Sequence, residues 1–342
     1  MKNTFKNVCA YCDKVIIGLL IAVVVIVPLL FDIRLYSVFD LSKVTALYLL
    51  TVALLFVWTI RLACKHDFKF SHTALDIPIL AYICVFILSS VISISPIMSL
   101  FGTYKRFEGL TATVCYIFVF YAIVNFITTK KRLYFFIISI LGGAIVSSWY
   151  GIAQHLGFDM FKWSSFEARR VFSTFGNPVF FSAYLVMTLP LAVVLFFINP
   201  PQQKELSASK NPSVVWIFFI IASILYTAFW LTNTRACFVA LLGGLTPLFF
   251  LIFKKQAGER YKFVVLVVVF VLIGIFFNIR HETSVIKHFA GDVKTAEIFT
   301  EEPIFGKTET RKGPWIANKI ADKFPATGSS FSRVFQYCAA LQ

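Results

Sequence analysis

The chain has 342 residues, of which 58% are hydrophobic and 14% are charged, and 40 of them are phenylalanines. A water-soluble domain of this length carries about a quarter charged residues, so the composition excludes that class and indicates an integral membrane protein. A formal net charge of +15 would usually suggest a nucleic-acid partner. Here the cations sit in short loops between apolar runs, where the positive-inside rule places them, so the charge is better explained by membrane topology. The seven cysteines give no disulfide framework, and Cys9-x-x-Cys12 lacks the second pair that a metal site needs.

In chain order, the apolar runs predict an all-α, polytopic bundle of nine transmembrane helices. The first run lacks a small-residue cleavage site and more runs follow, so we expect it to stay as an anchor. The predicted spans are Val15–Phe31, Val44–Ile60, Ala74–Ile94, Gly109–Ile127, Leu133–Ala153, Pro178–Ile198, Val214–Leu231, Ala236–Phe253 and Phe263–Ile279. We therefore predict a transmembrane domain over residues 1–279 and an extracytoplasmic segment over residues 280–342.

The distribution of Lys and Arg predicts which side each loop faces. With the N-terminus in the cytoplasm, the inner segments hold clearly more Lys and Arg than the outer loops. This orientation places Thr232-Asn233-Thr234-Arg235 outside, at the tip of a helical hairpin that covers Val214–Phe253. Arginine beside hydrocarbon is costly unless its guanidinium reaches water, lipid headgroups or an anion. Arg235 therefore becomes a candidate functional residue.

Topology disfavours cations in the outer loops, which also hold Arg34, Lys43 and Lys162. Four other outer cations become further candidates: Lys105, Arg106, Arg169 and Arg170. One interpretation is that the guanidinium groups bind an anion such as a diphosphate at the membrane surface. The other is that they snorkel to lipid phosphates or pair with Glu108 or Glu167. The spans carry no charged residue near their middle, so the sequence gives no support to an ion-coupled transporter.

The segment from Arg170 to Pro178 predicts a turn followed by a helix. Gly176 and Asn177 favour the turn, and Pro178 suits the first position of the sixth span. Free backbone amides at that helix start would help to hold a phosphate beside Arg170. The same residues also fit a plain helix start, and the spacing does not separate the two interpretations.

The end of the chain shows an unfinished helical pattern. Ser329-Ser330 favours a helix start, and apolar residues follow at helical spacing up to Gln342, at Phe331, Val334, Phe335, Cys338 and Leu341. The expectation is a fragment or a prematurely ended reading frame, and the alternative is a naturally frayed terminal helix.

Several of these stretches together resemble the bacterial O-antigen ligase and polymerase superfamily. Arg170-Val-Phe-Ser-Thr-Phe-Gly-Asn-Pro178, followed by the apolar run Phe180–Pro190, resembles a hallmark stretch of that family. The segment Gly102…Arg106…Gly109 looks like its earlier outer loop, and Thr232-Asn-Thr-Arg-Ala236 looks like its hairpin with an essential arginine. Ser330–Leu341 resembles the helix that precedes a glycine-rich loop in family members.

The resemblance implies a glycosyltransferase in the bacterial inner membrane that works without a cofactor or metal. Its donor would be a polyprenyl-diphosphate-linked glycan, and its acceptor a lipid A core, another glycan or a protein hydroxyl. Arg235 would be catalytic, and Arg170, Arg106, Arg169 and Lys105 would bind the donor diphosphate among membrane lipids. The family's further histidine lies beyond the matching region, and His155, His281 and His288 match no motif, so no general base is assigned.

Two other functions remain open from the sequence. A lipid-linked glycan transporter or flippase would show a water-accessible central cavity lined by polar residues. A non-catalytic membrane remnant would follow if the truncation removes the closing part of the enzyme.

Overall fold

The computed structural model describes residues 2–35, 37–64, 71–103, 106–159, 161, 170–197, 212–255 and 260–280. Within these ranges every regular element is a helix and no strand occurs. The described helices belong to one compact unit, Met1–Lys287. The tail that follows Arg280, with the helix expected after Ser329-Ser330, lies outside the described residues.

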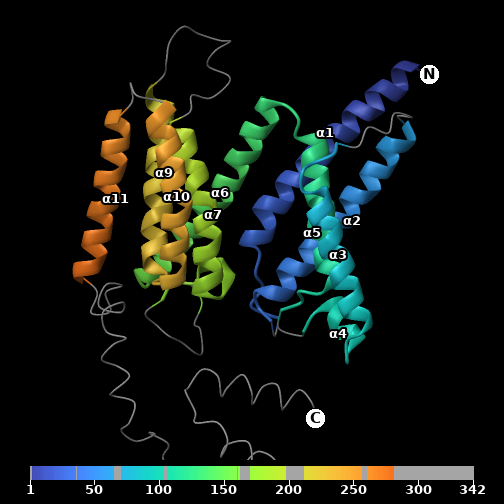
Figure 1. The fold of residues 1–342 in the computed structure, drawn as a ribbon, viewed down its shortest axis with the longest axis horizontal. Helices are drawn as coiled ribbons and strands as arrows, with labels where there is room; N and C mark the ends of the chain where they lie inside the picture. Colours follow the sequence, from blue (N-terminus) through green and yellow to red (C-terminus); the bar gives the residue numbers. More distant parts are fainter. Residues whose placement is uncertain are drawn as a thin grey trace, which may run out of the picture. The chain divides into compact units, whose positions relative to one another are not determined.

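The helices follow the predicted spans closely (Figure 1). They are α1 Lys2–Leu29, α2 Asp40–Cys64, α3 Asp76–Val91, α4 Pro96–Phe101, α5 Leu110–Phe126, α6 Lys130–His155, the 3₁₀ turn η1 Ser173–Phe175, α7 Pro178–Phe197, α9 Pro212–Leu231, α10 Arg235–Lys255 and α11 Arg260–Arg280. The short helix α4 was not predicted, because six residues are too few to show a helical repeat. α1 also begins well before the predicted span.

The lengths and surfaces of these helices are those of a membrane-embedded protein. In the described part of the chain, four helices are long and apolar enough to cross a bilayer: Asn7–Leu29, Asp40–Cys64, Lys130–His155 and Pro178–Phe197. A helix of about 20 residues spans roughly the 30 Å of the hydrocarbon layer. Large apolar side chains such as Ile77, Val85 and Met187 are exposed, as expected for residues that face lipid.

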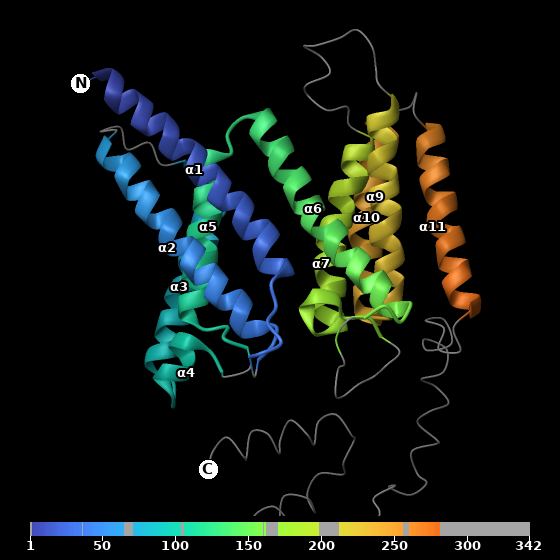
Figure 2. The same ribbon diagram turned by 180° about the vertical axis from the view of Figure 1, so that it is seen from behind.

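The buried side chains form two apolar clusters, and α6 contributes to both. In the ribbon views α6 lies between the helices that carry the two clusters (Figures 1 and 2). The first cluster joins α1, α2 and α5, and it includes Phe136 of α6. The second joins α6, α7, α9, α10 and α11, and it includes Leu141 and Ala144 of α6. α6 packs against α1, α7 and α9. It is therefore the element that connects the two clusters.

Glycines let α6 approach its neighbours closely. A Cβ on Gly143 would lie 3.4 Å from the Tyr184 hydroxyl and 3.6 Å from the Val24 carbonyl oxygen, and a Cβ on Gly151 would lie 3.0 Å from Val171. Gly143 and Gly151 are thus points of close approach. At Gly142 and at the Gly243-Gly244 pair an added Cβ meets nothing within 4 Å.

Candidate functional site

Arg170 is bound to the turn that precedes Arg235. Its Nε donates to the Thr232 carbonyl oxygen at 3.1 Å, and its Nη2 donates to the Thr234 hydroxyl at 3.0 Å. The next amide, Val171 N, donates to the Leu231 carbonyl oxygen at 3.2 Å. The last carbonyls of a helix lack partners within it and favour a cation. Arg170 thus satisfies the end of α9 and fixes the residue 232–235 segment, here called the hairpin tip.

The hairpin tip is a tight turn whose threonines are buried. Thr232 is fully buried and Thr234 is 5% exposed, while Asn233 has φ 47°, a left-handed conformation that Asn tolerates well. α10 begins at Arg235, which is half-buried. A helix start carries partial positive charge, because its first amides lack partners within the helix. The Arg235 side chain adds a full charge at this point, which favours an anion.

Gln154 near the end of α6 holds the loop that follows Arg170. Its Oε1 accepts from the amides of Phe172 at 3.2 Å and Ser173 at 3.1 Å. The Ser173 hydroxyl donates to the Ser147 carbonyl oxygen at 2.6 Å, and Ser173 itself has φ 51°. A non-glycine residue in this conformation costs energy, which its surroundings must supply. The 170–177 loop is therefore fixed to α6 by both side chain and backbone.

Asp159 in turn fixes Gln154. Its carboxylate accepts from Gln154 Nε2 at 2.8 Å, from the Tyr150 hydroxyl at 3.0 Å and from the amide of Phe161 at 3.1 Å. These three hydrogen bonds fix the position of the carboxylate. Asp159 thus orients the glutamine that holds the loop, and its position suits an anchor better than a proton acceptor.

Lys43 of α2 holds the loop from another side, a role that the sequence did not indicate. Its Nζ donates to the carbonyl oxygens of Pro28 at 2.8 Å, Leu30 at 3.1 Å and Thr174 at 2.8 Å. It also lies 4.9 Å from the centre of the Phe175 ring. Lys43 therefore joins the end of α1 to the 170–177 loop. The sequence hinted at Lys43 only through its predicted place in an outer loop, where the positive-inside rule disfavours lysine.

The predicted turn and helix start are confirmed in the backbone. Gly176 has φ 70°, and a Cβ there would collide with the Phe39 ring. α7 begins at Pro178, and Asn177 Oδ1 accepts from the Val179 amide at 2.8 Å. This capping contact shows that Asn177, and not a phosphate, satisfies that amide.

Of the two open interpretations, a plain helix start accounts for the amides of Val179 and Phe181, which bind the side chain and the carbonyl oxygen of Asn177. The amides of residues 171, 172, 173 and 179 all bind protein oxygens. The physical reason is that a buried loop must satisfy its own backbone groups, and Gln154 and the end of α9 supply the acceptors. Any anion at this site would depend on side chains and on the start of α10.

The remaining predicted cations are placed only in part. Arg106 lies exposed in the α4–α5 loop, within electrostatic range of Asp40 at the start of α2. Lys105 and Arg169 lie outside the described residues. The structure thus joins Arg170 to the hairpin tip by direct contact. It places Arg106 beside the start of α2, the helix that also carries Lys43.

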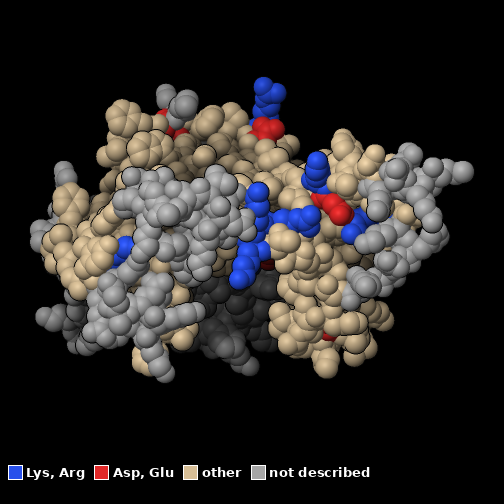
Figure 3. Space-filling model, turned by 90° about the horizontal axis from the view of Figure 1, so that it is seen from above, with Lys and Arg blue, Asp and Glu red and all other residues tan. Residues whose placement is uncertain are grey.

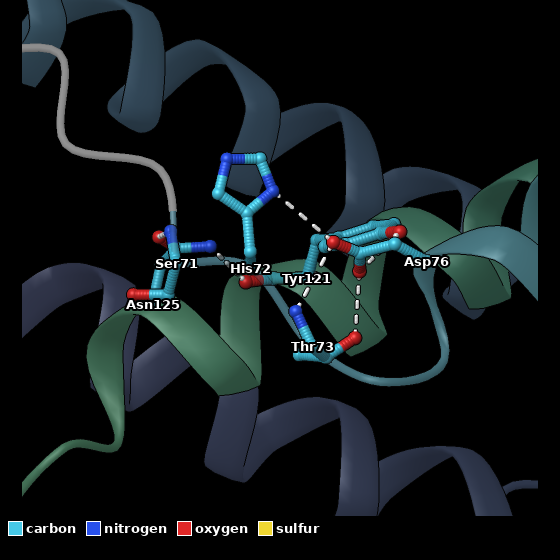
Figure 4. Close-up of polar contacts among 6 residues, drawn as sticks. All are labelled: Ser71, His72, Thr73, Asp76, Tyr121 and Asn125. Carbon is cyan, nitrogen blue, oxygen red and sulfur yellow. Dashed lines mark hydrogen bonds and ion pairs between the residues drawn. The ribbon is translucent and has the colours of Figure 1, made fainter.

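A second polar cluster lies where α3 begins and α5 ends (Figure 4). Asp76 accepts from the Thr73 hydroxyl at 2.6 Å, from the Thr73 amide at 3.1 Å and from the Tyr121 hydroxyl at 3.1 Å, and it pairs with His72 at 3.2 Å. Asn125 Oδ1 accepts from the Ser71 amide at 3.0 Å. Asp76, the first residue of α3, thus binds both the hydroxyl and the amide of Thr73, which precedes the helix. The cluster fixes α3 against α5.

The described helices define a polytopic, all-helical membrane protein. No family model, no curated protein and no solved structure matches the chain.

Proposed function

We propose that the chain is an O-antigen ligase-like glycosyltransferase of the bacterial inner membrane, with nine spans and a cytoplasmic N-terminus. Its site would lie at the outer face, where the 170–177 loop and the hairpin tip meet. The donor would be a polyprenyl-diphosphate-linked glycan, and the acceptor a hydroxyl on a lipid A core, a glycan or a protein. Sequence motifs in matching order support this proposal.

The observation that carries the proposal is the contact between Arg170 and the hairpin tip. Arg170 is 62 and 64 residues away from Thr232 and Thr234 in sequence, yet its guanidinium group contacts both of these residues of the hairpin tip. Two of the cations singled out from sequence therefore belong to one assembly. Arg170 acts in it as a positioning residue, since Nε and Nη2 bind protein oxygens. In the proposed reaction Arg235, at the start of α10, would meet the substrate.

Glycosyl transfer from this donor requires stabilisation of the leaving group, polyprenyl diphosphate. The acceptor oxygen bonds to the anomeric carbon as the bond from that carbon to the diphosphate oxygen breaks. The hydroxyl proton passes finally to water, and the polyprenyl diphosphate leaves with one more negative charge. A guanidinium at a helix start stabilises this developing charge, and more strongly beside hydrocarbon than in water. An interaction that strengthens in the transition state raises the rate of the step.

The test replaces Arg235 in vesicles that contain the purified chain, the lipid-linked donor and a lipid A core as the hydroxyl acceptor. We expect Arg235→Ala to slow release of polyprenyl diphosphate by on the order of a hundredfold. Arg34→Ala is the matched control, because Arg34 is an exposed arginine of the α1–α2 loop, and it should leave the rate unchanged. Equal rates for both variants and the unmodified chain would contradict the catalytic role.

The same vesicles separate the alternatives. Movement of the donor across the bilayer with its diphosphate bond intact would assign a transporter. Neither binding nor cleavage of the donor would indicate a non-catalytic remnant.

A further inference from the structure

One end of the bundle carries a group of cations that the proposed transfer does not use. Figure 3 shows Lys and Arg side chains gathered over the end where α1 and α6 begin and α2 ends. Arg132 donates to the Phe126 carbonyl oxygen at 3.0 Å, and Arg61 lies over the Phe126 ring while it pairs with Asp13. These contacts bring both arginines to the end of α5, next to the start of α6.

Lys130 and Lys131 are adjacent cations of this end, in the first turn of α6. Both are exposed, and the ion pairs found within the described ranges, Arg61–Asp13 and His72–Asp76, do not include them. The first turn of α6 also holds no acidic residue. Cations at a helix start are disfavoured by the partial positive charge there. An anion bound to these lysines would offset the repulsion between the two ammonium groups and the repulsion between them and the helix start.

An exposed stripe runs down α6 from Lys131. Phe135, Gly142, Val146 and Trp149 are all exposed, and their spacing places them on the same helix face as Lys131. An added Cβ on Gly142 meets nothing within 4 Å, so the stripe has a shallow point at its middle. The opposite face of α6 is buried in the two clusters. The stripe is therefore the part of this membrane helix that faces lipid.

We propose that α6 binds an anionic phospholipid, with the phosphate at Lys130 and Lys131 and an acyl chain along Phe135, Gly142 and Val146. Charge selects the headgroup, because two adjacent ammonium groups attract an anionic lipid at the membrane surface. Trp149 lies near the other end of α6, where an indole side chain suits the membrane–water interface opposite to the lysines. The site is independent of the proposed glycosyl transfer.

The test titrates the purified chain in detergent with phosphatidylglycerol or phosphatidylcholine of the same acyl chains and counts bound lipid by native mass spectrometry. We expect phosphatidylglycerol to bind the more tightly. The double variant Lys130→Gln/Lys131→Gln should weaken its binding roughly thirtyfold, at about fivefold for each lysine near the surface. Phosphatidylcholine binding should not change. Circular dichroism checks that the helices persist.

A second lysine pair gives the matched control. Lys254 and Lys255 are the last residues of α10, where a helix end favours cations. Lys254→Gln/Lys255→Gln should retain phosphatidylglycerol binding. An equal loss in this control would show general charge attraction and overturn the proposal, as would unchanged binding in the α6 variant.

Two further outcomes would also overturn it. Soluble glycerol phosphate that displaces the lipid at comparable concentration would assign the lysines to a free phosphate. A lipid-free dimer that protects a cysteine placed at Phe135 would assign the stripe to a second copy of the chain. Phe135→Ala should instead weaken phosphatidylglycerol binding several-fold while the chain stays monomeric.

Discussion

Single residues of the 170–177 loop differ sharply in how much substitution they should tolerate. Gly176 needs φ 70° and leaves no room for a Cβ beside Phe39. Gly176→Ala should therefore lower the free energy of unfolding in mild detergent by about 3 kcal/mol, through backbone strain and overpacking.

Gly18 supplies the comparison, since it lies inside α1 and an added Cβ meets nothing within 4 Å. Gly18→Ala should stabilise the chain by up to about 1 kcal/mol, because alanine favours helix. Thermal or denaturant unfolding, followed by circular dichroism, measures both variants. If Gly176→Ala were no less stable than Gly18→Ala, the tight packing at Phe39 would be refuted.

The loop also shows which residues sequence could predict. Gly176, Asn177 and Pro178 act through their own backbone preferences, so their turn and helix start were predictable. Lys43 and Gln154 were not, because their roles depend on partners that only folding brings near; Lys43 and Thr174 are 131 residues apart. The contact of Arg170 with the hairpin tip was hidden for the same reason.

At the scale of elements, Lys43 connects three pieces of structure: the end of α1, the start of α2 and η1. Lys43→Met keeps most of the length of the side chain but removes the ammonium donor from three carbonyl oxygens, of which only the Pro28 oxygen also accepts from the Thr174 hydroxyl. Since hydrogen bonds to charged groups are strong and unmet acceptors are costly, we expect a loss of about 3 kcal/mol in unfolding free energy.

Lys14→Met is the control, because Lys14 is an exposed lysine of α1. It should change stability by less than about 0.5 kcal/mol. Native hydrogen exchange gives the second measurement, in which amides of residues 171–175 should exchange faster in Lys43→Met alone. Unaltered exchange there would mean that Lys43 does not hold the loop.

The helices themselves were largely predictable, and the reason is the membrane. Lipid forces backbone groups to pair within a segment, so a long apolar run has few alternatives to helix. The packing of α6 between the two clusters could not be predicted from the apolar runs. In such a run the residues that face another helix and those that face lipid are equally apolar or small. Gly142 and Gly143 are neighbours, yet only Gly143 meets another helix.

For the whole molecule, the proposed orientation makes a direct prediction about sides of the membrane. In a chain without native cysteines, Arg34→Cys in the α1–α2 loop should react with an impermeant maleimide in intact cells. Thr128→Cys in the α5–α6 turn should react only after the membrane is opened. Both positions are exposed, so the side of the membrane on which each cysteine lies decides whether the maleimide reacts with it. The reverse pattern would place the hairpin tip in the cytoplasm and remove the proposed site from the outer face.

The way the 170–177 loop is held has a consequence for biosynthesis. Its supports on α1, α2 and α6 are already made when the ribosome reaches residue 177, but Leu231, Thr232 and Thr234 come later in translation. Until the α9–α10 pair has inserted, Arg170 lacks those oxygens, and the loop is held only from α1, α2 and α6. The assembly is therefore completed by a late step in membrane insertion, and a ribosome stalled before the hairpin would leave it open.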